Sequence, residues 1–249
     1  MTDHASRASS ALALIESNIK QFGHHTYLVT GGPSPRFAYT IGLSQALGAE
    51  LALPGASFFT AQEVKRIVDE IVHHLRAQGT VSEKSLDLKE LGTFFLRRAD
   101  PSWTKMLLLG AMHFYKEQEI SAFQICPDET HATIDVPDLG RVWNSRSEPV
   151  WQWLREPWPY PVSERSVATT NLNALRGARV TEAARWEPDQ WEMFAGAGPD
   201  VAQEDVRVVP LATLLAADRS LEQATTLEVG KALWRNASET EWHPWATGA

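Results

Sequence analysis

The chain has 249 residues, of which 43% are hydrophobic and 22% are charged, a composition typical of a globular protein and unlike that of a disordered one. Its formal net charge of −8 argues against nucleic acid as a partner, because an acidic surface repels phosphate backbones. The single cysteine, Cys126, cannot close an internal disulfide, and the sequence shows neither a membrane-spanning run nor a secretion signal, so we expect a cytoplasmic protein with no membrane partner.

The first half of the chain predicts helices that alternate with strands. Apolar residues at helical spacing predict an amphipathic helix over residues 8–22 that ends at Gly23. The Gly- and Pro-rich segment 31–35 is typical of a hairpin loop. Thr60 and Glu63 have the capping-box spacing that begins a helix, here over residues 61–78. Strands are predicted at residues 25–30, 37–43, 50–54, 94–96 and 121–125.

A further helix is predicted over residues 101–117, because Asp100 is a good N-cap and Pro101 suits the first helical position. The first two strands are joined by a short loop, so the N-terminal sheet is predicted to be mostly antiparallel. The three predicted helices are expected to cover one face of that sheet. The predicted fold class is therefore α+β, with an antiparallel sheet covered by helices followed by a smaller β-rich module.

Residues 144–163 separate a predicted domain over 1–143 from a predicted module over 164–249. This segment combines four prolines with tryptophans, and proline excludes both a helix interior and a central strand. We therefore predict a stiff connector that packs on its surroundings. The module beyond it is predicted to contain strands at 206–209 and 231–235 and a short helix at 211–217.

Several motifs lie together between residues 10 and 135. The string Tyr39-Thr40-Ile41-Gly42-Leu43 follows the segment Gly23–Val29. Further along the chain come Glu50, the pair Phe114-Tyr115, and the segment Phe123–Asp128. On these residues, this part of the chain resembles the bacterial family of unknown function numbered 4262. It departs from the family pattern at Ala49 and Cys126, where the family has proline and tryptophan. The resemblance implies no particular reaction.

A second, less specific pattern covers residues 165–245. It consists of Trp186 to Gly196, Val206 to Leu211, Asp218 to Leu221, Gly230 to Arg235, and Trp242. Their order is similar to that in the immunity-protein-like family numbered 2185. That resemblance implies a role in bacterial toxin–immunity systems. The expected partner is therefore a protein, and more specifically a basic toxin.

The sequence predicts no metal site and no catalytic residue. In each of the pairs His24-His25 and His73-His74, neighbouring side chains diverge, so neither pair binds one ion by itself. Cys126 is predicted to be a buried, inert thiol. The Gly31–Arg36 segment leads into a strand, which favours a hairpin turn over a phosphate-binding loop.

Six residues remain as candidates for binding a ligand: His25, Tyr39, Thr40, Gly42, Gln124 and Asp128. Adjacent strand residues point to opposite faces, so at most one of Tyr39 and Thr40 is expected in the core. The other would offer a hydroxyl beside Gly42, where a ligand could approach closely. The alternative for these strand residues is a purely structural role, and for Asp128 it is a solvated loop.

The ten tryptophans are many for a chain of this length. Most are expected to pack in cores, but tryptophan is also enriched at binding hot spots. The candidates for an interface are Trp186, Trp191, Trp234 and Trp242.

Three functions from different classes follow. The first is a non-catalytic interaction protein of the toxin–immunity class, which the acidic charge and the C-terminal resemblance favour. The second is a domain that binds a small ligand or a flavin-type cofactor, which a loose likeness of the first strands to flavin-binding split barrels suggests. The third is a structural or regulatory module of a larger assembly. The oligomeric state is left open.

Overall fold

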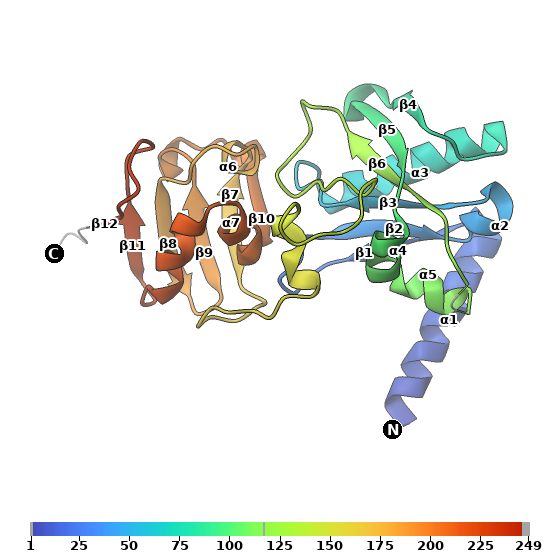
Figure 1. Ribbon diagram of the computed structural model, residues 1–249, viewed down its shortest axis with the longest axis horizontal. Helices are drawn as coiled ribbons and strands as arrows, with labels where there is room; N and C mark the ends of the chain where they lie inside the picture. The colour runs from blue at the N-terminus through green and yellow to red at the C-terminus, as the bar shows by residue number, and fades with distance from the viewer. Residues whose placement is uncertain (1, 117, 246–249) are drawn as a thin grey trace.

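The computed structural model describes residues 2–116 and 118–245, which form two six-stranded sheets with helices packed against them (Figure 1). The predicted α+β class is confirmed. The two sheets lie next to each other along the long axis of the molecule, joined by the segment around residues 149–154 (Figure 1). In the described ranges, no helix has both the length and the apolar character that a membrane span requires.

The first sheet has the strand order β1-β2-β3-β6-β5-β4. Its neighbouring strands are antiparallel except for the parallel pair β3 and β6, as predicted for a mostly antiparallel sheet. The strands are β1 (His25–Val29), β2 (Phe37–Ile41), β3 (Glu50–Pro54), β4 (Lys84–Asp87), β5 (Thr93–Arg98) and β6 (Ala122–Pro127). The Gly31–Arg36 segment is the β1–β2 hairpin connection, and Cys126 lies within β6 instead of after it.

Helices cover both faces of this sheet, so the expectation that they cover one face is wrong. Alternate residues of β2 belong to different cores: Ala38 lies in the core beneath α3 (Ala61–Gln78), and Tyr39 and Ile41 lie in the other. That second core includes Ile15 of α1 (Thr2–Phe22) and residues of α4 (Pro101–Leu107) and α5 (Leu109–Phe114). With both faces covered, a central strand buries every side chain.

Two of the three predicted helix starts are confirmed in detail, whereas α1 begins at Thr2 and not at residue 8. Thr60 and Glu63 form both hydrogen bonds of a capping box at the start of α3, and the left-handed Gly79 ends it. Asp100 caps α4 through the backbone N–H of Ser102. The predicted helix over 101–117 is divided at Leu108 into α4 and α5, and its last predicted residue, Glu117, lies outside the described residues.

The connector packs into both halves of the molecule. Its 3₁₀ helix, Pro149–Leu154, places Trp151 in the core of the first sheet, where the indole N–H donates to the Asp135 carbonyl oxygen over 2.9 Å. Further along, Trp158 and Tyr160 pack against the core of the second sheet. The prediction of a segment that packs on its surroundings is confirmed.

The second sheet has the order β10-β7-β9-β8-β11-β12, with β7 and β9 parallel and the other neighbours antiparallel. Its strands are β7 (Val167–Asn171), β8 (Glu182–Glu187), β9 (Gln190–Phe194), β10 (Val206–Pro210), β11 (Lys231–Trp234) and β12 (His243–Pro244). Strands β10 and β11 match predicted ranges, whereas β7, β8, β9 and β12 have no predicted counterpart. Residues 246–249 of the predicted module lie outside the described residues.

One face of the second sheet carries its hydrophobic core. The helices α6 (Leu172–Leu175) and α7 (Leu211–Ala217) and the 3₁₀ helix Arg219–Thr226 pack there with Ala183 and Met193. Ala183 pairs with Met193 in register, and the next residue, Ala184, pairs with Glu192 and Ala232. Because strand residues alternate, Ala184, Glu192 and Ala232 lie on the opposite face, which we call the outer face.

Candidate functional site

Thr40 and Gly42 lie around a buried carboxylate that was not among the predicted site residues. Glu50 begins β3 and is fully buried. Its Oε2 accepts a hydrogen bond from the Thr40 hydroxyl over 2.6 Å. Its Oε1 accepts from the Tyr115 hydroxyl over 2.5 Å and from the backbone N–H groups of Gly42 and Ser44. Both carboxylate oxygens therefore have neighbouring donors.

This cluster brings together residues of three separate motifs in the N-terminal resemblance. Gly42 has φ 109°, in the left-handed region that favours glycine, and its N–H points at both Glu50 and Tyr115. Burial, followed by the adjacent Glu50 carboxylate, raises the pKa of Tyr115, so its hydroxyl keeps the proton that it donates. The cluster ties β2 and β3 to the end of α5, which is a structural role for the YTIGL string.

Tyr39 is also buried, which corrects the expectation that only one of Tyr39 and Thr40 enters the core. The reason is that both sheet faces are covered. The Tyr39 hydroxyl accepts a hydrogen bond from the Gly110 N–H over 3.0 Å, and its ring stacks on Tyr27. Burial raises the pKa of Tyr39 to about 12. His25 lies apart from these residues, at the edge strand β1, where its Nδ1 accepts from Asn18 Nδ2 over 2.8 Å.

Gln124 is buried, and both ends of its amide bind the loop that follows β6. Its Nε2 donates to the Pro137 carbonyl oxygen over 2.6 Å, and its Oε1 accepts from the Leu139 N–H over 2.8 Å. A side chain that satisfies two buried backbone groups fixes the loop. The structure thus gives Gln124 a positioning role for this loop.

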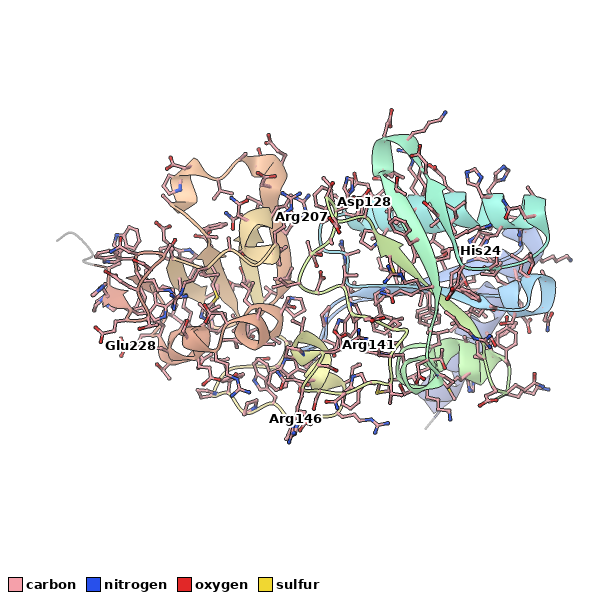
Figure 2. All side chains as sticks on the ribbon, turned by 45° about the horizontal axis from the view of Figure 1, so that its top comes forward. His24, Asp128, Arg141, Arg146, Arg207 and Glu228 are labelled. Carbon is pink, nitrogen blue, oxygen red and sulfur yellow. The ribbon has the colours of Figure 1, made fainter. Side chains whose placement is uncertain are left out.

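Asp128 and Arg207 of β10 are both seen at the junction between the two halves of the molecule (Figure 2). Its carboxylate accepts hydrogen bonds from the Thr93 N–H over 2.9 Å and from the His131 ring at 2.7 Å. Burial opposes its ionisation, but these hydrogen bonds outweigh burial and lower the pKa of Asp128. The His131 ring in turn packs edge-on against Phe58, which also contacts Arg207.

Cys126 is half-buried on β6, and burial raises the pKa of its thiol to about 11. A thiol with so high a pKa carries little thiolate at neutral pH, and thiolate is the nucleophilic form. Cys126 is thus less buried than expected, and its inertness stays a prediction.

The four predicted interface tryptophans divide into two pairs. Trp191 and Trp242 are 1% and 8% exposed and pack in the core of the second sheet, which corrects the expectation of a surface role for them. Arginine guanidinium groups cover both rings: Arg185 lies 4.8 Å from the centre of Trp191, and Arg235 lies 4.1 Å from that of Trp242. Trp186 and Trp234, in contrast, are 52% and 40% exposed.

Trp186 borders a groove of about 490 Å³ on the outer face of the second sheet. The lining of the groove is largely apolar and includes Ala184 of β8 and Ala232 of β11, which pair in register. Trp245, which is 47% exposed, lines the same groove, and its backbone N–H donates to the Ala232 carbonyl oxygen. Trp234 pairs in register with Glu182, so it also lies on the outer face.

Two carboxylates lie in this groove. Glu192 accepts a hydrogen bond from the Trp186 indole over 2.7 Å, and Glu182 accepts from the Gly198 N–H over 2.8 Å. The surrounding part of the chain is acidic as well, since residues 164–249 contain 13 Asp and Glu but only eight Lys and Arg. Exposed indoles beside carboxylates are suited to a partner that is both apolar and basic. We define the outer-face groove as Glu182, Ala184, Trp186, Glu192, Ala232 and Trp245.

Comparison with known proteins gives one finding for the first half of the chain. Residues 18–132 match the model of the family described as Domain of unknown function (DUF4262). No curated protein and no solved structure matches the chain. The matched range contains the whole Thr40–Gly42–Glu50–Tyr115 cluster and ends just past Asp128, whereas the outer-face groove lies beyond it. The resemblance over residues 165–245 stays a prediction. The N-terminal part of this chain is a DUF4262 domain.

Proposed function

We propose that this protein binds a basic protein partner at the outer-face groove, and that it belongs to the toxin–immunity class. The observation that carries the proposal is the group of exposed indoles, Trp186 and Trp245, beside the carboxylates of Glu182 and Glu192. Tryptophan contributes a large share of binding energy in many interfaces when it is surrounded by groups that exclude water.

The arrangement favours binding over a purely structural surface. A sheet face that stays exposed to water normally carries mainly polar side chains, whereas this groove combines two glutamates with alanines and exposed tryptophans. The opposite face of the same sheet already supplies the core of this half, so the exposed indoles are not needed for folding. The net acidic charge of residues 164–249 would speed association with a basic partner and make it sensitive to salt.

The experiment is native mass spectrometry of the full chain purified from its own host, with Trp186→Ser and Glu192→Lys variants in parallel. We expect a basic protein bound to the wild type and lost from both variants. Phe95→Ser is the matched control, because Phe95 is an exposed aromatic residue on a strand of the other sheet. A complex that survives both groove substitutions, or one with an acidic partner, would contradict the proposal.

The toxin–immunity assignment needs a second readout. The captured basic protein is expressed in a sensitive bacterium with the wild-type chain or with Trp186→Ser. Growth rescue by the wild type but not by the variant is expected for an immunity protein. A captured protein that is not toxic would leave the binding site in place but refute the toxin–immunity class.

A further inference from the structure

A polar pocket of about 460 Å³ lies in the DUF4262 domain. All its residues belong to the first half of the chain, whereas the outer-face groove belongs to the second half. The pocket is formed where the end of α1 and the start of β1 meet one side of α3. Its residues come from three elements: Asn18 from α1, His24 to Thr26 around β1, and Lys65, Asp69, His73 and Arg76 from α3. The pocket contains three histidines, two cationic side chains and one carboxylate.

His24 is the most enclosed of these side chains, with 9% of its surface exposed. Its Nε2 lies 3.1 Å from Asp69 Oδ1, so this nitrogen carries a proton and donates it to the carboxylate. Its Nδ1 is buried and has no hydrogen-bond partner among the described residues. A buried polar atom without a partner costs free energy, so a ligand that supplies the partner is favoured at this position.

Two neighbours have free hydrogen-bonding groups as well. The hydroxyl of Thr26 is buried and lacks a partner within the described part of the chain. His25 Nδ1 accepts from the Asn18 amide, which places the imidazole proton on Nε2. Burial, followed by the charge of His24, lowers the pKa of His25, so a neutral ring with an Nε2–H donor is the form at neutral pH.

The charges around the pocket favour an anion. Asp69, its single carboxylate, is already matched by Lys65 Nζ at 3.0 Å and by His24. Arg76 remains as an additional cation, held in place by the hydrogen bond from its Nη1 to the Phe22 carbonyl oxygen. His73 is exposed at the rim of the pocket.

We propose that this pocket binds the oxyanion group of a small molecule, a phosphate or a carboxylate. The group accepts a hydrogen bond from Thr26 Oγ1 and, on taking up a second proton at Nδ1 with the anion, from His24, whose Nε2–H stays on Asp69. His25 points to the other side of β1 and lines the pocket without binding the same oxygens. A metal ion is the weaker alternative, since no three His, Cys, Asp or Glu side chains converge on one point in residues 2–116 and 118–245. A DUF4262 domain that binds a metabolite in this way would add a small-molecule site to a protein-binding chain.

The test is titration of the full chain with inorganic phosphate and, separately, with acetate, followed by the ring-proton signals of the histidines in NMR spectra. Saturable shifts of the His24 and His25 signals are expected with at least one of the two anions. A response to phosphate alone points to a phosphorylated ligand, whereas a response to acetate points to a carboxylate. No saturable shift with either anion would overturn the proposal.

Thr26→Val provides a variant that leaves folding intact, because it removes a hydroxyl that has no partner and keeps a β-branched residue in the strand. Its affinity for the anion is expected to fall roughly tenfold, the usual effect of losing one hydrogen bond to a charged group. The matched control is Thr30→Val, an exposed threonine just past β1. If both variants lost affinity equally, or if neither lost any, the anion would not bind at Thr26 and the proposal would be overturned.

His24→Asn tests the central residue, with His74→Asn on the exposed side of α3 as its control. We expect the His24 variant to lose the saturable shift of the His25 signal and the His74 variant to keep it. Circular dichroism and the melting temperature report whether each variant is folded. A folded His24→Asn variant that binds the anion as well as the wild type would refute the assignment.

Discussion

The guanidinium group of Arg207 donates two hydrogen bonds to the carbonyl oxygen of Phe58, from Nε over 2.9 Å and from Nη2 over 2.7 Å. These residues are far apart in the sequence: Phe58 lies in the loop between β3 and α3, and Arg207 lies on β10 of the second sheet. Arg176 approaches the same phenyl ring and donates to the Thr130 carbonyl oxygen over 2.8 Å. Phe58 packs against both cores, so these two arginines join the halves of the molecule at one point.

Replacing Arg207 is expected to loosen this junction. Arg207→Ala removes both bonds to the Phe58 carbonyl oxygen and leaves that oxygen short of donors, at a cost of about 1–3 kcal/mol. We expect lower stability in urea unfolding, with earlier exposure of the junction to proteolysis. The control is Arg141→Ala, because Arg141 is exposed and its ion pair with Asp138 contributes little. Equal stability of the two variants would contradict a role of Arg207 in the junction.

Glu50 is expected to tolerate an amide better than truncation. In Glu50→Gln, the remaining oxygen still accepts from Tyr115 and from the backbone, and the new amide group donates to Thr40. Glu50→Ala leaves several buried donors unpaired, at a cost of roughly 3 kcal/mol or more. Thermal unfolding of the two variants measures the difference. If the amide were as damaging as alanine, the negative charge itself and not hydrogen bonding would be the essential property.

Asp218 and Arg235 form an ion pair, 2.8 Å long, in which the arginine side chain is fully buried. Burial disfavours the Asp218 carboxylate, but hydrogen bonds from Ser220 and Arg235 outweigh it and lower its pKa below the usual 3.8. The stabilisation is therefore complete above about pH 4–5 and is lost as the pH falls through the lowered pKa. Asp218→Asn is expected to be less stable at pH 7, by roughly 1–3 kcal/mol since Asp218 is partly exposed, and to show a weaker loss of stability on acidification. Urea unfolding at a series of pH values measures both effects, and parallel curves for variant and wild type would refute them.

Replacing either of two tryptophans of the second sheet is expected to lower the free energy of unfolding by very different amounts. Trp191→Leu removes a fully buried ring from the core and is expected to cost about 3 kcal/mol or more. Trp186→Ser changes an exposed ring on the outer face and is expected to cost less than about 1 kcal/mol. Urea unfolding followed by circular dichroism compares them. A large loss in Trp186→Ser would show that the groove serves folding and would weaken the proposed interface.

The thiol of Cys126 is expected to react slowly in the native protein. Burial raises its pKa to about 11, so alkylation by iodoacetamide at pH 8 is expected to proceed much more slowly than for the same chain in denaturant. The rate is measured by mass spectrometry over time. Equal rates in native and denatured protein would mean that the native thiol is accessible and ionises as readily as in the unfolded chain.

The sequence alone determined the local structure wherever a short-range signal was strong. The Thr60–Glu63 capping box, the Asp100 N-cap and the Gly31–Pro35 loop each act within a few residues, and all three are found as predicted. The family motifs also pointed to residues that matter, since Thr40, Gly42, Glu50 and Tyr115 meet in one cluster.

Tertiary structure decided what each of those residues does. The sequence could not show that helices cover both faces of the first sheet, and for that reason Tyr39 and Thr40 are both buried and cannot offer a free hydroxyl. It could not separate Trp186 from Trp191 either, because that difference depends on which face of β8 and β9 meets α7. Strand β7 of the second sheet has a weak local pattern and owes its pairing to β9 and β10, which lie well beyond it in the chain. Burial and pairing of this kind are properties of the packed chain, so they follow from long-range contacts and not from any short segment.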